Sequence, residues 1–123
     1  MDAMDKMDKL VQKQRIEPQS KTRRWSRYEV EVRVKVVLPN RGAIYGQGSD
    51  VSQGGMALFI PTELEKGQTV QAEILLPYTR EKVMLRGVVR NREGFRYGIE
   101  FADLSDHEKL LIERVCRALA MVQ

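Results

Sequence analysis

The chain has 123 residues, of which 42% are hydrophobic and 31% are charged. This length supports one domain with its own core, and the composition is typical of a folded soluble protein rather than a disordered one. The apolar runs are too short for a transmembrane helix, and the charges near the start exclude a secretory signal. Cys116 is the only cysteine, which excludes an internal disulfide and a cysteine-based metal cluster. We therefore expect a cytoplasmic protein without membrane insertion.

Positive charge is concentrated in one short stretch of the chain. The net charge is +4 at pH 7. Residues 18–42 hold seven basic and two acidic residues, whereas residues 43–123 hold ten basic and eleven acidic residues. Such a local excess indicates a site for an anion rather than a surface that coats a nucleic-acid polymer.

Residues 1–22 have the composition of a tail. Met1, Met4, Met7 and Leu10 follow helical spacing, so a short amphipathic helix is one alternative. Pro18 and its polar neighbours favour a flexible connection instead. We predict a flexible N-terminal arm over residues 1–22 and a single domain over residues 23–123.

Four segments carry the period-two alternation of half-buried β-strands. The clearest is Tyr28 to Leu38, where valines alternate with charged residues, and the others are residues 70–76, 83–89 and 95–101. Two further strands are predicted at residues 43–48 and at residues 56–60, a short apolar run that Pro61 ends. Glycine, proline and asparagine separate them, as turns require. The pattern predicts a mainly β domain, either a sandwich or a small barrel, and closure into a barrel would remove exposed strand edges.

The last segment changes to helical periodicity. Ser105 and Glu108 have the spacing of a capping box, in which each side chain accepts a hydrogen bond from an otherwise unpaired backbone N–H. The apolar residues that follow lie at spacings of three and four, namely Leu110, Leu111, Val115, Ala118, Leu119 and Val122. We predict a C-terminal amphipathic helix that packs against the barrel, with a partner-binding face as the alternative.

Residue types that support catalysis are scarce. The only histidine, His107, is expected at the exposed start of this helix, and Cys116 is expected inside it as a small apolar residue. The chain contains no P-loop, dinucleotide fingerprint or H-E-x-x-H motif. We therefore expect no catalytic residue, no bound metal and no cofactor, and conclude that the protein is not an enzyme.

Two polar segments stand out from this scaffold. The first is Arg23-Arg24-Trp25-Ser26-Arg27, directly before the first strand. An arginine fork can bind phosphate oxygens or the O6/N7 edge of guanine bidentately. Four extended residues span up to roughly 13–14 Å, so Arg23 and Arg27 can grip different parts of one ligand. Taken alone, however, such arginines are more typical of a solvated surface.

The second segment is Asp50-Val51-Ser52-Gln53-Gly54-Gly55. The carboxylate of Asp50 suits the N–H donors of guanine, and the hydroxyl of Ser52 can donate to a base or phosphate. Glycine lets the backbone approach a ligand closely. Taken alone, this segment is more typical of a turn between strands.

Together, the two segments are more specific. An R-x-x-x-R motif entering the first strand, followed by a D-x-S-x-x-G motif about twenty residues later, resembles the PilZ domain family. The strand Gly98-Ile99-Glu100-Phe101 and the helix opened by Ser105 are also similar to the last strand and helix of that family. The resemblance covers roughly residues 20–120 and implies a six-stranded antiparallel β-barrel with a C-terminal helix.

The resemblance also implies a ligand, because PilZ domains bind the bacterial second messenger cyclic di-GMP. Arg23 and Arg27 would contact phosphates and the guanine Hoogsteen edge, with Arg24 as an extra phosphate or stacking group. The barrel would contribute Asp50 and Ser52 to the other guanine edge, and Gly54 and Gly55 would leave room for the rings. Ligand binding would order the arm over the barrel and so alter a contact with a protein partner. The partner is unidentified, with motility, pilus or exopolysaccharide machinery all compatible, and we expect a monomer or weak homo-oligomer.

Two other functions remain as alternatives. One is a PilZ-like interaction module that binds no ligand, although the chain keeps both motifs. The other is a small barrel that binds single-stranded nucleic acid, which requires a basic groove with exposed aromatic side chains. Phe95, Tyr97 and Phe101 are instead expected on an inward face, and aromatic residues make up only 7% of the chain.

Overall fold

The structure, a computed structural model, describes residues 25–123. In this range six strands and one helix follow one another along the chain. They are β2 (Tyr28–Leu38), β3 (Gly42–Val51), β4 (Gly55–Phe59), β5 (Thr69–Leu75), β6 (Lys82–Glu93), β7 (Arg96–Ala102) and α2 (Asp106–Val122). The arm predicted over residues 1–22 and the arginines at positions 23 and 24 lie outside the described residues.

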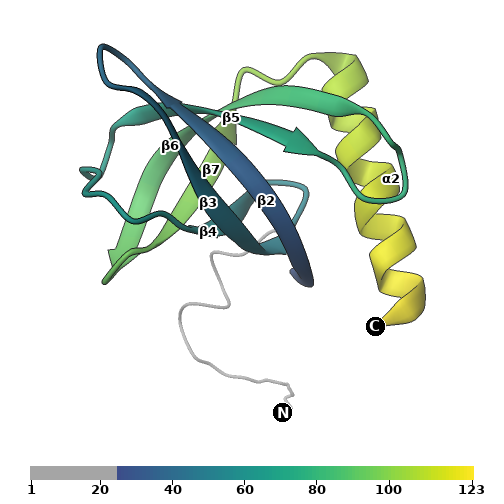
Figure 1. Cartoon of the computed structure of the whole chain (residues 1–123). Helices are drawn as coiled ribbons and strands as arrows, with labels where there is room; N and C mark the ends of the chain where they lie inside the picture. The colour runs from purple at the N-terminus through teal and green to yellow at the C-terminus, as the bar shows by residue number, and fades with distance from the viewer. Residues whose placement is uncertain (1–24) are drawn as a thin grey trace.

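The six described strands close into an antiparallel barrel in the order β2-β3-β4-β7-β6-β5 (Figure 1). Closure is made by β5, which pairs back onto β2, with Val34 opposite Ile74 and Val36 opposite Ala72. The prediction of a mainly β, six-stranded barrel with a C-terminal helix is therefore confirmed. Closure leaves each of these strands with a neighbour on both sides, which removes the open edges of a sandwich.

Two strands are longer than their alternation indicated. Strand β3 continues beyond Gly48 to Val51, and β6 continues beyond Val89 to Glu93. The connection predicted at residues 91–94 is therefore shorter than expected. It is a tight turn between Glu93 of β6 and Arg96 of β7, with Gly94 at φ 64°. The added residues of β6 are polar and exposed, so they gave no strand signal, and in β3 a register shift between Gly48 and Asp50 breaks the alternation.

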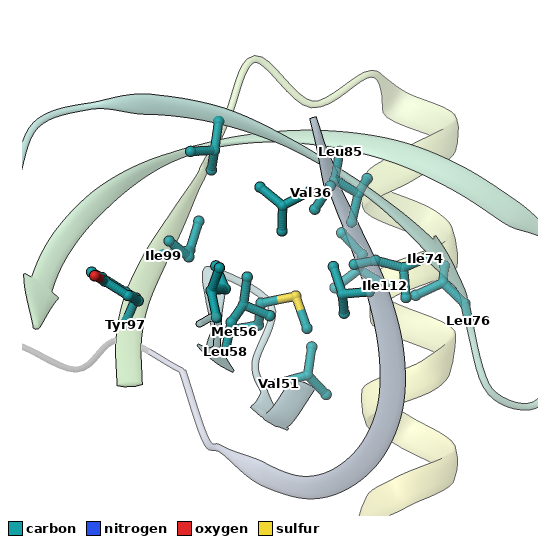
Figure 2. Packing of buried hydrophobic residues seen from close by; sticks show 14 of the residues in the cluster. Val36, Val51, Met56, Leu58, Ile74, Leu76, Leu85, Tyr97, Ile99 and Ile112 are labelled. Carbon is teal, nitrogen blue, oxygen red and sulfur yellow. The ribbon is translucent and has the colours of Figure 1, made fainter. Parts of the chain in front are cut away.

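The core fills the barrel and extends to the inner face of α2. Its side chains come from every described strand and from the helix, and include Val36, Val51, Leu58, Ile74, Leu85, Ile99 and Ile112 (Figure 2). Tyr97 lies within it, and its hydroxyl donates to the backbone oxygen of Thr62 (2.8 Å) and accepts from the N–H of Leu64 (3.0 Å). This buried hydroxyl ties the segment after β4 to the barrel.

One of the predicted inward aromatic residues is in fact exposed. Tyr97 is buried and Phe101 packs against the core, as expected. Phe95 is half exposed, because it lies in the turn before β7 rather than in the strand. The alternation that placed all three on one face ends at residue 96.

Helix α2 begins at the predicted capping box and lies beside the barrel (Figure 1). Ser105 accepts from the N–H of Glu108 (3.1 Å), and the carboxylate of Glu108 accepts from the N–H of Ser105 (2.9 Å). The helix buries one face, consisting of Leu111, Ile112, Val115, Cys116 and Leu119. The prediction that the apolar stripe packs against the barrel is confirmed for this face.

Two residues of the predicted stripe are exposed instead. Leu110 is 42% exposed and Val122 is 67% exposed. Leu110 precedes the buried Leu111, and a rotation of about 100° per residue carries it out of the contact. Val122 is the last residue of the helix. Gln123, the residue after it, exchanges two hydrogen bonds with the backbone of Glu29 in β2 (2.7 and 3.0 Å). No helix in residues 25–123 is long and apolar enough to cross a membrane.

Candidate functional site

A β-bulge decides where Asp50 points. Along β3, Gly46 and Gly48 face inward, since a Cβ on Gly48 would lie 2.7 Å from the side chain of Val32. Strict alternation would then direct residue 50 into the core as well. The ladder with β4 shifts register between Gly48 and Asp50, and Val51 is buried in place of Asp50. A bulge that re-aims a side chain is a recurrent feature of ligand sites.

The outward-pointing carboxylate of Asp50 bridges two arginines. Its Oδ1 accepts from Nη1 of Arg27 at 2.9 Å, and its Oδ2 accepts from Nη2 of Arg96 at 2.9 Å. Asp50 is only 17% exposed in its side chain, whereas Arg27 and Arg96 are 33% and 38% exposed. The arrangement therefore places two guanidinium groups at the surface around one largely covered acid.

The segment after Asp50 forms a tight turn held by Ser52. The N–H of Ser52 donates to the backbone oxygen of Gly55 (2.8 Å), and its hydroxyl donates to the same oxygen (3.3 Å). The hydroxyl also accepts from the N–H of Gly54 (3.2 Å). Ser52 is 6% exposed, so its hydroxyl is directed into the turn. The turn thus fixes the distance between β3 and β4 directly beside the Asp50 carboxylate.

Both glycines of this turn are required by close contacts. A Cβ on Gly55 would lie 2.1 Å from the backbone oxygen of Ile99 in β7. A Cβ on Gly54 would lie 2.6 Å from the indole ring of Trp25. The indole of Trp25 therefore packs on the turn, and the chain that leads into β2 crosses the barrel surface next to the site.

An open groove of about 940 Å³ borders the Asp50 carboxylate. Its polar lining comes mainly from the start of β2 and from β3, with Phe59 of β4 and Arg96 of β7 on another side. In the part of the chain that the structure describes, the charged groups lining it are the carboxylates of Glu29, Glu31 and Asp50 and the guanidinium of Arg96. Arg27 adds a further cation at the edge of the groove through its contact with Asp50.

The structure brings together part of the site predicted from sequence. Arg27 contacts Asp50, and Ser52, Gly54 and Gly55 form the turn beside them. Arg23 and Arg24 lie outside the described residues. Arg96 was missed, because it belongs to neither motif and lies 46 positions from Asp50. In the sequence, Arg96 is marked only as an arginine at an outward position of a strand. Such arginines are too common to indicate a functional residue.

Among residues 25–123, no group of three or more His, Cys, Asp or Glu side chains could hold a metal ion. His107 is exposed and lies 3.3 Å from the carboxylate of Glu81. Cys116 is buried, and burial raises the pKa of its thiol to about 11. A protonated thiol is a poor nucleophile.

The family model described as PilZ domain matches residues 21–118, which include both motifs and the six described strands. The chain belongs to the PilZ domain family. No curated protein sequence matches this PilZ domain.

Solved structures of other PilZ domains share the fold at low sequence identity. The PilZ domain of CeSA from a cellulose-synthesizing bacterium is 18% identical, with a TM-score of 0.63, and the match covers 77% of this chain and 98% of that one. The PilZ domain with c-di-GMP of YcgR from Escherichia coli is 18% identical, with a TM-score of 0.68 and coverage of 82% and 93%. The MrkH–c-di-GMP complex of K. pneumonia is 17% identical, with a TM-score of 0.68 and coverage of 81% and 53%.

Proposed function

We propose that this PilZ domain is a receptor for cyclic di-GMP. The observation that carries the proposal is the contact between Arg27 and Asp50, which come from the two motifs and lie 2.9 Å apart beside an open groove. Cyclic di-GMP offers two phosphates and two guanines. Guanidinium forks complement its phosphates and Hoogsteen edges, and a carboxylate complements the N–H donors of guanine. Two of the solved relatives described above contain this ligand.

The three arginines of the first segment, Arg23, Arg24 and Arg27, would supply the charge that the groove lacks. Since three carboxylates line the groove, a ligand with two negative charges is repelled unless cations accompany it. Arg23 and Arg27 would contact phosphates and a Hoogsteen edge, and Arg24 would add a phosphate or stacking contact. Arg27 would leave Asp50 for the ligand, which frees Oδ1 to accept from one of the two N–H donors on that edge of guanine.

Ser52 and the two glycines have a supporting role in this proposal. The Ser52 hydroxyl is occupied within the turn, so we assign it to holding the turn in place more than to direct readout. Gly54 leaves room for the indole of Trp25 and Gly55 leaves room for the backbone of β7, so we assign the two glycines to holding the turn rather than to contacting a guanine ring. Packing of Trp25 on Gly54 brings the first motif to the same surface.

The proposed output is a change in a protein contact rather than a chemical reaction. A ligand held by both motifs would fix the segment that carries Arg23 and Arg24 against the barrel. Such a switch requires the ligand to bind the closed arrangement more tightly than the open one. The protein partner would read the new surface formed by this segment and the barrel.

Isothermal titration calorimetry with cyclic di-GMP tests the proposal, with GTP, cyclic di-AMP and a single-stranded oligonucleotide as controls. We expect saturable binding of cyclic di-GMP alone, with a stoichiometry of one or two, and a change in the fluorescence of Trp25, the only tryptophan. Absence of heat and of a fluorescence change at high protein concentration would contradict the proposal and favour an interaction module without a ligand. Strongly salt-dependent binding of the oligonucleotide would favour a nucleic-acid barrel.

A further inference from the structure

Arg96 holds the second oxygen of the carboxylate that we assign to guanine. Its Nη2 donates to Asp50 Oδ2 at 2.9 Å, and both residues line the groove. We propose that Arg96 is a positioning residue that sets the orientation of the Asp50 carboxylate and thereby the preference of the site for guanine. This inference rests on the proposed function.

The position of Arg96 is better fixed than that of Arg27. Arg96 is the first residue of β7 and pairs with Phe59 of β4 on one side and with Glu93 of β6 on the other. Its guanidinium carbon lies 6.0 Å from the centre of the Phe59 ring, within the range of a cation–π contact. Arg27 precedes β2 and has no strand register of its own. When a phosphate draws Arg27 away, Arg96 can therefore remain on Asp50.

Retention of Arg96 matters because a carboxylate turns easily about its Cβ–Cγ bond. This torsion has broad minima, so a carboxylate without a partner samples many orientations. Each carboxylate oxygen has two acceptor positions, so Oδ2 can accept from Arg96 and from the ligand together. With its plane held, Asp50 presents both oxygens to the N1–H and N2–H of guanine without a further ordering cost.

The proposed role makes a specific prediction about the exocyclic amine of guanine. Cyclic di-inosine monophosphate has the same phosphates and keeps N1–H but lacks the N2 amine. If the carboxylate is held in one orientation, a hydrogen bond from the N2 amine adds clearly to the affinity. If the carboxylate turns freely, the same hydrogen bond adds much less. Loss of Arg96 should therefore reduce the preference for guanine over hypoxanthine more than it reduces the attraction for phosphate.

The experiment is calorimetric titration of the full chain with cyclic di-GMP and with cyclic di-inosine monophosphate. Arg96→Met removes the guanidinium but keeps a long apolar stem over Phe59, and Arg96→Ala is the second variant. Arg117→Ala is the matched control, because it removes an exposed, ion-paired arginine on α2. Thermal unfolding is measured for each variant to establish that it folds.

We expect the unchanged chain and Arg117→Ala to prefer cyclic di-GMP by about tenfold. In both Arg96 variants this preference should fall below about threefold. If the variants weaken both ligands by the same factor, or neither, Arg96 does not position Asp50 and the inference is wrong. Equal binding of both ligands by the unchanged chain overturns the inference but leaves the receptor function. Binding of neither ligand by the unchanged chain refutes both.

Discussion

Arg27 and Asp50 lie 23 positions apart in the chain and form an ion pair of 2.9 Å. The Asp50 carboxylate, whose side chain is 17% exposed, is compensated by this ion pair and by the one with Arg96. Under the proposed function, cyclic di-GMP would replace Arg27 on Asp50, so its contacts would have to outweigh this ion pair.

Arg27→Ala should weaken cyclic di-GMP binding by at least about 100-fold, because a charge-assisted phosphate contact is lost and the Asp50 charge loses one of its two partners. The fold should be retained, since Asp50 keeps Arg96 as a partner and the ion pair with the one-third exposed Arg27 contributes only about 1 kcal/mol to stability. Calorimetry and thermal unfolding measure the two effects. Arg23→Ala should have a similar effect on binding, and Arg117→Ala none. Unchanged affinity in both the Arg27 and the Arg23 variant would show that this motif does not hold the ligand.

Gly55→Ala should destabilise the barrel by about 2–3 kcal/mol, because its Cβ would meet the backbone oxygen of Ile99 at 2.1 Å. The new Cβ is fixed to the backbone of β4 and the oxygen belongs to the backbone of β7, so neither atom can move away without shifting a strand. Gly54→Ala is the comparison, since its Cβ would meet the Trp25 side chain at 2.6 Å, and a side chain can move. We expect the second variant to lose less than half as much free energy of unfolding in urea. Equal losses would mean that the two contacts are relieved in the same way.

Tyr97→Phe should lower the free energy of unfolding by about 1–3 kcal/mol, because the N–H of Leu64 and the backbone oxygen of Thr62 lose their shared partner. Tyr45→Phe is the control, as its side chain is 53% exposed. It should change stability by less than about 0.5 kcal/mol. Urea unfolding of the two variants measures the difference, and similar values for both would show that the buried hydroxyl contributes nothing.

Cys116 should be unreactive towards thiol reagents at pH 8 in the native protein and reactive in urea. Burial raises the pKa of the thiol from 9.0 to about 11, so the native state disfavours the thiolate. The unfolded state loses the proton first, and the native protein should therefore lose stability as pH rises from about 9 to 11. Relative to Cys116→Ala, this loss should amount to about 2 kcal/mol by pH 11. A difference between the two proteins that does not change with pH would contradict it.

Local signals in the sequence were enough for most of the fold. The valine alternation before Leu38 predicted β2, and the capping box at Ser105 predicted the start of α2. These succeed because strand and helix periodicity depend on near neighbours in the chain. Prediction from periodicity was wrong where near neighbours do not determine the structure. Phe95 is the example, because its exposure follows from the position of the turn between β6 and β7.

The candidate site divides in the same way. The spacing of its motifs in the sequence was sufficient to single out Arg27, Asp50 and the glycine turn, and to place the chain in a family. The outward direction of Asp50 depends on a bulge in the β3–β4 ladder, and the contact with Arg96 depends on the order in which six strands close. Both are properties of strand pairing between distant segments, which no local pattern encodes. The residue types needed for an anion site can thus be read from the chain, whereas their mutual contacts exist only once the barrel has closed.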